Sequence, residues 1–233
     1  MAGEGSRFAK AGYIFPKPLI DVAGKPMIQR VVENLDFKGA NYIFLVRKEH
    51  LEKYPGMSDT LNRITGDNTH QIIIVDELTD GAACTALLAR KLINNHDDLL
   101  IANSDQVIEY QKENFKNLKN MTDINSAVFT FNATHPKWSF VKTNEAGYIV
   151  EVAEKKPISD IATCGIYWYR KGSDFVKYAE RMIEKNIKVN NEFYIAPVYN
   201  ELIEDGKTLV PFYVNKMHGM GTPADLESYL KVL

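Results

Sequence analysis

The sequence predicts an α/β fold with a mostly parallel but mixed sheet in three layers and an antiparallel lid inserted in the second half. Two observations predict it. Up to residue 124, short β-branched or aromatic runs alternate with amphipathic helical patterns, and beyond that point strand-like runs follow one another directly. Strands that are apolar on both faces and are separated by helices form a parallel sheet covered on both sides.

The first half supplies the alternating elements. Apolar runs predict strands at NYIFLV (41–46), QIIIVD (71–76) and DLLIANS (98–104). Helical periodicity predicts helices near 57–65, at 82–93 and at 112–121. Because each helix lies between two strands, the pattern favours parallel pairing.

The second half supplies the lid. Strands are expected at SAVFTFNAT (126–134), SFVKT (139–143), YIVEVAE (148–154) and ATCGIYWYR (162–170), with a turn at NEAG (144–147). Helices are expected at about 172–186 and 194–204, then a strand at TLVPFYV (208–214) and a last helix opened by Pro223 and capped by Thr222. We see no linker or repeat, so the whole chain, 1–233, is interpreted as one domain with a Rossmann-like core.

The composition is that of an ordinary soluble protein. The 233 residues are 45% apolar, and the formal net charge of −2 gives no electrostatic footprint for nucleic acid. Cys84 and Cys164 each lie in an apolar run, which suits buried thiols in a reducing compartment. Neither a membrane span nor a signal peptide is visible, so we expect a cytoplasmic protein without membrane contact; whether it forms a homo-oligomer stays open.

The amino-terminal stretch GEGSR is the most unusual chemistry in the chain. Glycines let the backbone approach a phosphate and aim successive N–H groups at it. A dinucleotide fingerprint would need a third glycine where Phe8 stands, and a P-loop would need Gly-Lys-Ser/Thr. A flexible tail is the plain alternative. A buried strand normally precedes such a loop, so either about five residues of strand are lacking before Met1 or the sheet does without that strand.

The rest of the opening decides between these alternatives. Arg7 follows Gly5-Ser6, and then come Pro16-Lys17-Pro18 and Gly24-Lys25-Pro26. This series resembles the sugar-phosphate nucleotidylyltransferase family, and the resemblance continues through TDGAACTA (79–86), NSDQV (103–107), EKKP (154–157), TCGIYWY (163–169) and GMGTPADL (219–226). It implies a nucleotide-binding half at 1–124 and an acceptor-binding half with the C-terminal helix at 125–233.

The family's reaction needs positioning and charge more than a base. An acceptor phosphate attacks the α-phosphorus of a nucleoside triphosphate and pyrophosphate leaves; a phosphomonoester is already largely dianionic at neutral pH. The resemblance implies that Arg7 binds the departing phosphates and that Lys17 bridges the α-phosphate and the incoming oxygen. The nucleotide-binding residues that it implies are Ala2, Gly3, Gly5, Ser6, Asp76, Glu77, Thr79, Gly81, Ala82 and Ser104.

Base recognition in the family falls on the segment VDELTDGAACTA. Gly81 and Ala82 would leave room for a flat base, and Asp76 or Glu77 would bond its edge. The alternative interpretation is a helix beginning at Gly81 and capped by Thr79 or Asp80, and both can hold together. The acidic pair replaces the glutamine expected in thymidylyl or uridylyl enzymes, which leaves the base open.

Asp105 is the expected Mg²⁺ ligand and the third catalytic residue. It follows the apolar run LLIAN, at the carboxyl end of a strand where α/β sheets bind ligands, and Mg²⁺ prefers oxygen ligands. The family's second carboxylate commonly lies in D-x-G-T, but Gly219 stands at that position. Either one carboxylate and the phosphates suffice, or another residue replaces it.

The acceptor would be a phosphorylated small molecule. Matching positions for its binding are Ser139, Lys155, Lys156, Thr163, Gly165 and Glu192, whereas Trp138 is interpreted as packing. GMGTPADL and HPKWSF resemble a branch found in bacterial capsule loci, which includes a CTP:phosphoglutamine cytidylyltransferase, and this resemblance favours CTP. Two other functions stay open: a nicotinamide-dependent enzyme, suggested by the α/β order and GxG, and a non-catalytic sugar-nucleotide-binding relative.

Overall fold

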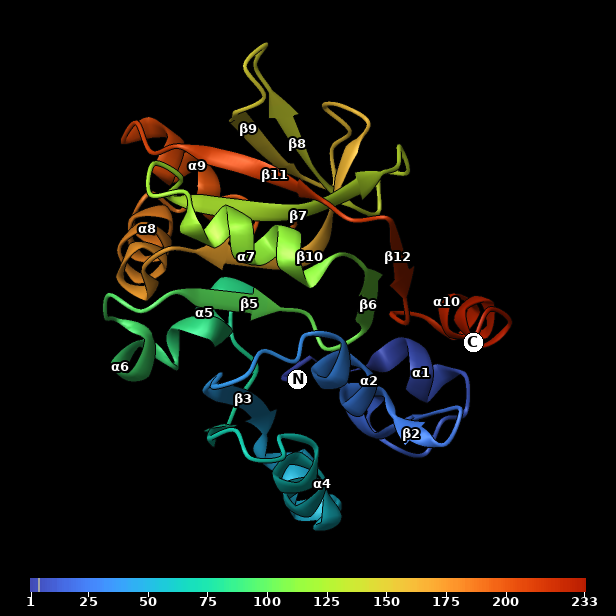
Figure 1. Cartoon of the computed structure of the whole chain (residues 1–233). Coiled ribbons are helices and arrows are strands. Elements are labelled where there is room, and N and C mark those ends of the chain that lie inside the picture. Colours follow the sequence, from blue (N-terminus) through green and yellow to red (C-terminus); the bar gives the residue numbers. More distant parts are fainter. Residues whose placement is uncertain (4) are drawn as a thin grey trace. The chain divides into compact units, whose positions relative to one another are not determined.

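The computed structural model describes residues 1–3 and 5–233, which group into two compact units. Unit 1 comprises Met1–Leu78, Asn103–Ile108 and Met217–Leu233, and unit 2 comprises Thr79–Ala102 and Glu109–Lys216. The units therefore interleave along the chain. Figure 1 shows the elements of both.

Unit 2 is built on a six-stranded mixed sheet with strand order β11-β7-β10-β8-β9, in which β5 also pairs with β10. β10 runs antiparallel to β5, β7 and β8, β8 runs antiparallel to β9, and β7 runs parallel to β11. The strands are β5 (Leu99–Ala102), β7 (Ser126–Asn132), β8 (Ser139–Thr143), β9 (Ile149–Glu154), β10 (Ile161–Tyr169) and β11 (Leu209–Tyr213).

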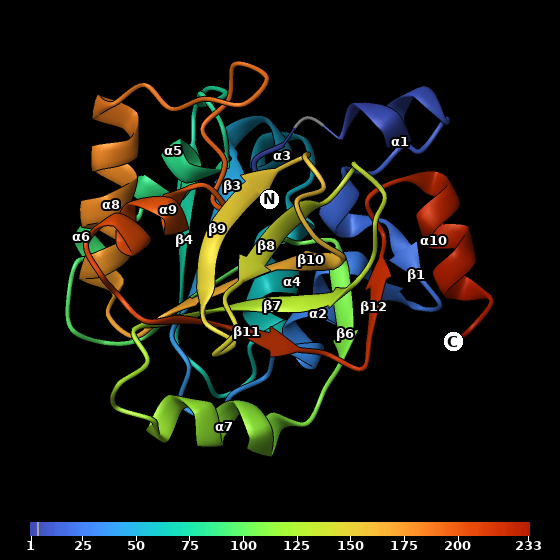
Figure 2. The ribbon, with the colours of Figure 1, turned by 90° about the horizontal axis from the view of Figure 1, so that it is seen from above.

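Helices cover both faces of this sheet. Successive side chains of β10 point to opposite faces, so neighbouring residues contact helices on opposite sides. Trp168 contacts Phe115 of α7 (Lys112–Asn120) on one face, at 6.0 Å between ring centroids. Tyr169 contacts Phe175 of α8 (Gly172–Glu184) and Tyr199 of α9 (Val198–Glu204) on the other, at 5.4 and 4.9 Å. Figure 2 shows α7 on one side of the sheet and α8 and α9 on the other, so unit 2 has three layers.

Unit 1 contains the amino-terminal loop and a parallel pair of strands. β3 (Tyr42–Arg47) pairs in parallel with β4 (His70–Val75), and β6 (Gln106–Glu109) pairs with β12 (Lys216–Gly219). The remaining elements are α1 (Ser6–Lys10), the 3₁₀ turn η1 (Lys17–Leu19), the hairpin β1–β2 (Asp21–Val22 and Lys25–Pro26), α2 (Met27–Asn34), α3 (Lys48–Lys53), α4 (Gly56–Ile64) and α10 (Pro223–Leu230).

The α/β class with a mixed sheet is confirmed, and the antiparallel pairing expected after residue 124 is present. The parallel share is smaller than expected, because β5 pairs with the reversed strand β10. Thr222 caps α10 as expected: its hydroxyl accepts a hydrogen bond of 3.1 Å from the Asp225 N–H.

Two helices differ from their expected bounds. The helix expected at 82–93 forms as α5 (Ala82–Leu87) and α6 (Arg90–Ile93), because Leu88 and Ala89 donate to carbonyls only three residues back, which tightens the chain. The helix expected at 194–204 begins only at Val198, after Pro197.

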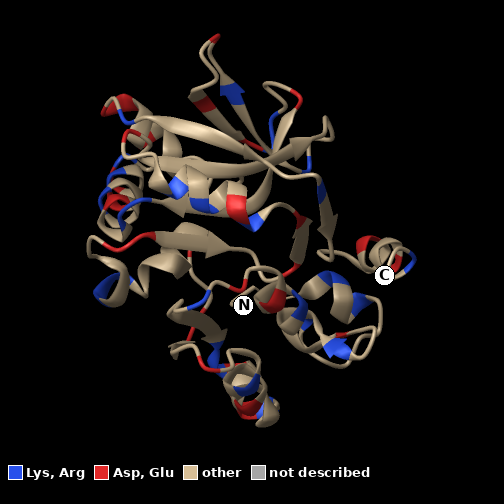
Figure 3. Ribbon diagram, in the orientation of Figure 1, with Lys and Arg blue, Asp and Glu red and all other residues tan. Residues whose placement is uncertain are grey.

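The distribution of charged residues and the burial of Cys164 agree with the compositional analysis, whereas Cys84 is less buried than expected. Acidic and basic side chains are interspersed along the elements of each unit (Figure 3). Cys164 is buried and Cys84 half-buried, and both thiols are free. Within residues 1–3 and 5–233, no helix is both long and apolar enough to cross a membrane.

Candidate active site

The glycine loop enters α1 in unit 1. Gly5 precedes this helix with φ 63°, a left-handed conformation that favours glycine, and its carbonyl accepts bonds from the Phe8 and Ala9 N–H groups. Phe8 is buried and packs edge-on against Tyr13, so the position of the missing third glycine serves the core. Ser6 and Arg7 are exposed on α1, as is Gly3 in the loop, while Ala2 is half-buried.

Lys17 and Asp105 form an ion pair, although 88 residues separate them in sequence. Lys17 opens η1 between two prolines, and Pro16 before it has an extended backbone (φ −62°, ψ 149°), with φ fixed by its ring. The loop lies against this lysine, because a Cβ added to Gly5 would be 3.6 Å from the Lys17 Cβ. Two predicted catalytic residues and the glycine loop therefore meet in unit 1.

Backbone bonds hold Asp105 in place. Its carbonyl accepts a hydrogen bond of 2.7 Å from the Met220 N–H. On β6, the Asn34 amide bonds both backbone groups of Ile108, donating to the carbonyl at 2.8 Å and accepting from the N–H at 2.9 Å. A Cβ added to Gly221 would lie 3.1 Å from the Asp105 Oδ2. The GMGT segment thus lies beside Asp105, as the motif order implied.

The single carboxylate of Asp105 fits a magnesium ion whose other ligands are phosphate oxygens and water. Among the described residues, no group of three or more His, Cys, Asp or Glu side chains could hold a metal by itself. Mg²⁺ is commonly bound by one or two carboxylates together with phosphate oxygens and water. Asp105 is a half-buried carboxylate with oxygen donors only, so it suits that mode of binding.

The remaining predicted residues of unit 1 are exposed or half-buried. Asp76 and Glu77 follow β4 and are exposed, and the Asp76 carboxylate lies 4.0 Å from the Lys48 ammonium. Ser104 is half-buried in the turn before β6. Lys25 pairs with Glu33 of α2 at 2.7 Å, which gives it a contact within the fold.

In unit 2, Gly81 meets main chain rather than open space. It has φ 120°, and an added Cβ would lie 2.6 Å from both the N and the O of Phe193. The capping alternative is wrong in detail: α5 begins at Ala82, and no side chain caps it. Thr79 instead donates to the Gly81 carbonyl at 3.1 Å and bonds the Thr85 hydroxyl at 2.5 Å, while Ala82 is exposed.

The acceptor candidates on β8 and β10 surround a carboxyl group. The Ser139 hydroxyl donates to the Glu154 carboxylate, and the buried Thr163 hydroxyl bonds the Tyr167 hydroxyl at 3.3 Å. Burial raises the pKa of Glu154 above its ordinary value, although the Ser139 bond and the nearby Lys155 charge act against the rise. Burial also raises the pKa of Tyr167. Three hydroxyl side chains, those of Ser139, Thr163 and Tyr167, thus lie in the same region as the Glu154 carboxyl group.

Gly165 makes the irregularity that shapes this strand. It has φ 69°, and the register between β10 and β7 shifts between Thr163 and Tyr167. A bulge of this kind needs a residue that tolerates left-handed backbone, and it re-aims the neighbouring side chains.

The other acceptor candidates lie in the loops of unit 2. Lys155 has φ 54° and donates to the Tyr194 hydroxyl at 2.5 Å, with its ammonium 4.4 Å from the ring centroid. Lys156 and Glu192 are exposed. Trp138 packs edge-on against Phe131 at 5.4 Å, as interpreted.

Comparison with known proteins decides the family. A model of the nucleotidyl transferase family matches residues 1–229. The chain belongs to this family. It is 26% identical over 209 residues to the bifunctional protein GlmU of Methanocaldococcus jannaschii, covering 88% of this chain and 46% of that protein. It is 27% identical over 195 residues to a probable mannose-1-phosphate guanylyltransferase 2 of Arabidopsis thaliana, covering 80% of this chain and 54% of that protein. The chain thus spans about half the length of these curated relatives.

Solved structures share the fold of this nucleotidyl transferase. A nucleoside-diphosphate-sugar pyrophosphorylase from Vibrio cholerae RC9 has a TM-score of 0.83 at 23% identity, over 99% of this chain and 98% of that one. A UDP-glucose pyrophosphorylase complexed with UDP-glucose has a TM-score of 0.77 at 17% identity, over 99% and 95%. These likenesses confirm the fold class.

Sequence reasoning missed several residues that build the site of this family member. Glu154 lies in the quoted EKKP motif but was passed over for the lysines, and Tyr167 in TCGIYWY was interpreted as part of a strand. Asn34 and Phe193 act through bonds to distant backbone, which no local pattern signals. Asn34 directly precedes the apolar Leu35 near the end of a helical stretch, RVVENL, which gives little hint of its role.

Proposed function

We propose that this nucleotidyl transferase moves a nucleoside monophosphate from a nucleoside triphosphate to a phosphorylated small acceptor, with release of pyrophosphate. The observation that carries the proposal is the meeting of Lys17, Asp105 and the glycine loop in unit 1, at the positions of the motifs. The relatives include proteins named for mannose 1-phosphate and nucleoside-diphosphate sugars, so a sugar phosphate is the first acceptor class to test.

The residues of unit 1 would act by position and charge. N–H groups of the loop around Gly3, Gly5 and Ser6 would hold the triphosphate, and the exposed Arg7 would bind the β- and γ-phosphates with its guanidinium fork. Lys17 would leave Asp105 and contact the α-phosphate as the acceptor oxygen attacks. Because the acceptor is already anionic, no side chain needs to remove a proton.

Asp105 would hold Mg²⁺ together with the phosphates of the nucleotide. When bound, the ion would neutralise charge on the triphosphate and the departing pyrophosphate. A dependence on magnesium is therefore part of the proposal.

Unit 2 would contribute the acceptor contacts. Glu154, aligned by Ser139, is a hydrogen-bond acceptor suited to a hydroxyl of the acceptor molecule, and Lys155 adds a positive charge nearby. CTP is the donor favoured by the resemblance of HPKWSF and GMGTPADL to the capsule branch, and a precursor of capsule or surface polysaccharide is the corresponding product.

A non-catalytic relative that only binds sugar nucleotides is the second candidate. Gly219 in place of the expected aspartate is the observation that favours it. The ion pair of Lys17 with Asp105 weighs against it, because a binding protein has no need to keep both groups.

One assay separates these functions. The protein is incubated with each of the four ribonucleoside triphosphates and dTTP, with Mg²⁺ and a panel of phosphorylated acceptors, and pyrophosphate release is followed. We expect turnover with CTP that falls by about 10²–10³ in kcat in Lys17→Ala, because one preorganised contact to the transition state is lost. The exposed helix residue Lys53 is the matched control, and Lys53→Ala should leave the rate unchanged. Nucleotide binding without turnover on any acceptor would favour the binding protein instead.

A further inference from the structure

Two segments far apart in the sequence are joined by their main chains in unit 2. The Phe193 N–H donates to the Asp80 carbonyl at 2.7 Å, and the Ala83 N–H donates to the Phe193 carbonyl at 2.9 Å. Gly81 lies between these two bonds, with its α-carbon so close to Phe193 that an added Cβ would lie 2.6 Å from main-chain atoms. The chain between α8 and α9 therefore returns to the start of α5 (Figure 2).

Side chains reinforce this junction. The Lys188 ammonium lies 3.2 Å from the Asp80 carboxylate and 4.6 Å from the centroid of the Phe193 ring. Phe193 is only 4% exposed, so its ring anchors the returning chain in the core. Main-chain bonds, an ion pair and a buried ring thus fix segment 188–193 to segment 79–83.

A tight turn fixes the rest of segment 188–193. Val189 and Glu192 exchange two backbone hydrogen bonds of 3.0 Å, and the residues between them, Asn190 and Asn191, have φ 48° and 63°. Two central residues with positive φ are the mark of a type I′ turn, for which asparagine is favoured. The turn leaves little freedom to Glu192, which directly precedes the anchored Phe193.

We propose that the Gly81–Phe193 junction couples nucleotide binding to acceptor binding. Segment 79–83 carries the predicted base-binding residues and segment 188–193 carries Glu192, so the inference rests on the proposed function. The bonds of the junction join the two segments, so a ligand that binds one segment in the joined state suppresses local opening of the junction and thereby favours binding of the second ligand to the other segment. Gly81 and Phe193 are positioning residues in this scheme, and the coupling is reciprocal.

Hydrogen exchange tests the coupling with nucleotide alone. The probe is the α,β-methylene analogue of CTP, with Mg²⁺ and without acceptor, and exchange is followed in peptides that cover 186–194. We expect the amides of Glu192 and Phe193 to exchange about 5-fold more slowly or better, the lower end of ordinary coupling factors. Bound probe with unchanged exchange at 188–193 would overturn the coupling and leave the proposed function standing. If neither this probe nor the α,β-methylene analogue of any other ribonucleoside triphosphate or of dTTP binds in equilibrium dialysis, both proposals are overturned.

Matched asparagine variants test the reverse direction. Asn191 and Asn186 both have positive φ, but Asn186 follows the end of α8, outside the junction. Asn191→Ala should weaken binding of the probe about 5-fold or more, because alanine strains the turn and loosens segment 79–83 through Phe193. Asn186→Ala carries the same strain and should stay within about 2-fold of the wild type. Equal affinities of the two variants would overturn the proposal, since a nonspecific loss of stability affects both.

Discussion

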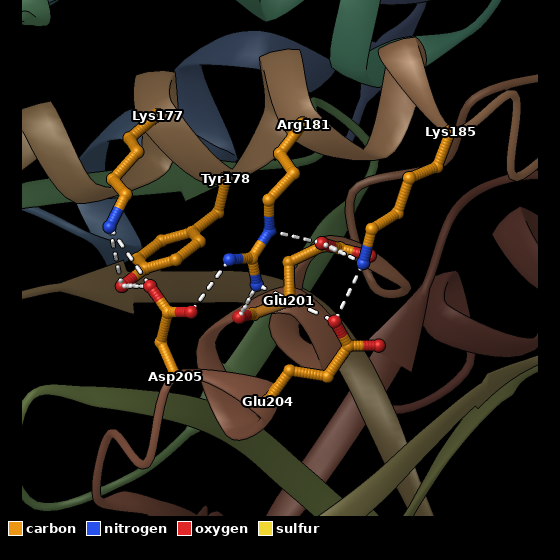
Figure 4. Close-up of polar contacts among 7 residues, drawn as sticks. All are labelled: Lys177, Tyr178, Arg181, Lys185, Glu201, Glu204 and Asp205. Carbon is orange, nitrogen blue, oxygen red and sulfur yellow. Dashed lines mark hydrogen bonds and ion pairs between the residues drawn. The ribbon is translucent and has the colours of Figure 1, made fainter.

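Arg181 holds a buried carboxylate between α8 and α9. Glu201 is only 1% exposed, and the Arg181 guanidinium donates both to its carboxylate and to its backbone carbonyl. Figure 4 shows the guanidinium reaching Asp205 as well, at 2.6 Å, while Lys185 approaches Glu201 at 2.9 Å. Arg181 and Lys185 of α8 thus both compensate a buried charge on α9, and Arg181 also bonds the backbone of Glu201.

Arg181→Met should destabilise unit 2 by about 3 kcal/mol. Loss of one partner from a buried ion pair costs about 3–5 kcal/mol, because the remaining charge stays buried without compensation. Lys185 still contacts the Glu201 carboxylate, so the lower end applies. At about 2–4 °C per kcal/mol for a chain of this size, the melting temperature should fall by about 6–12 °C. Arg181→Met combined with Glu201→Met should recover most of the loss, since an apolar pair needs no compensation.

Urea unfolding followed by tryptophan fluorescence measures this loss in unit 2, because Trp138 and Trp168 both lie there. Lys177→Met is the matched control: Lys177 lies one helical turn from Arg181, pairs with Asp205 at 2.9 Å and is largely exposed. Its variant should unfold at the urea concentration of the wild type, because exposed pairs contribute little. An Arg181→Met variant that unfolds together with this control would refute the reasoning.

Three further predictions follow from other contacts. Lys17→Met should bind Mn²⁺ about 5-fold more tightly than the wild type in electron paramagnetic resonance titrations without nucleotide, because the ammonium competes with the cation for Asp105; unchanged affinity would contradict that competition. Glu154→Gln should gain thermal stability over the wild type as pH rises from about 4 to 8, since a carboxyl whose folded pKa is raised favours the folded state only while protonated; a difference independent of pH would contradict it. Gly172→Ala should cost about 1–3 kcal/mol in urea unfolding, because its Cβ would lie 2.0 Å from the Ile93 carbonyl oxygen; full stability would show that the helix start can shift.

Strands were predictable where a run of β-branched and aromatic residues marks them in the sequence. The runs 41–46, 71–76 and 126–134 are rich in β-branched and aromatic residues, and each contains a strand within a residue or two of the expected bounds. Their order in the sheet was not predictable, because strand pairing depends on contacts between distant segments. β10 shows this: it pairs with β5, which lies about 60 residues earlier in the chain, and runs against it.

Short elements escaped prediction for a different reason. The β1–β2 hairpin has two residues in each strand, joined by Ala23 and Gly24 with φ 49° and 80°, and so few residues give no periodicity. α2 did carry a signal, since Met27, Ile28, Val31 and Val32 recur at helical spacing and are all buried.

The site in unit 1 was predictable because its parts are ordered motifs. Nothing local links Lys17 to Asp105, yet each was chosen from its own motif, and the structure brings them into contact. In unit 2 the charged lysines of EKKP were favoured over Glu154, whose neighbours come from β8 and β10. Burial of a carboxyl group and the shift of its pKa depend on those neighbours, so the sequence could not rank the four residues of the motif.

Gly81 has a structural requirement that is independent of the role predicted for it. From the sequence, this glycine is interpreted as room for a base against the backbone. The structure gives a requirement that holds without any ligand, because the main chain of Phe193 fills the space of a side chain. Since the contact is with the N, C and O atoms of Phe193, no change of that residue's side chain could make room for a Cβ at position 81. The φ of 120° adds a second restriction, because L-residues with a side chain rarely adopt it. The glycine is therefore required by the junction first, and any base that binds there meets a backbone already fixed by Phe193.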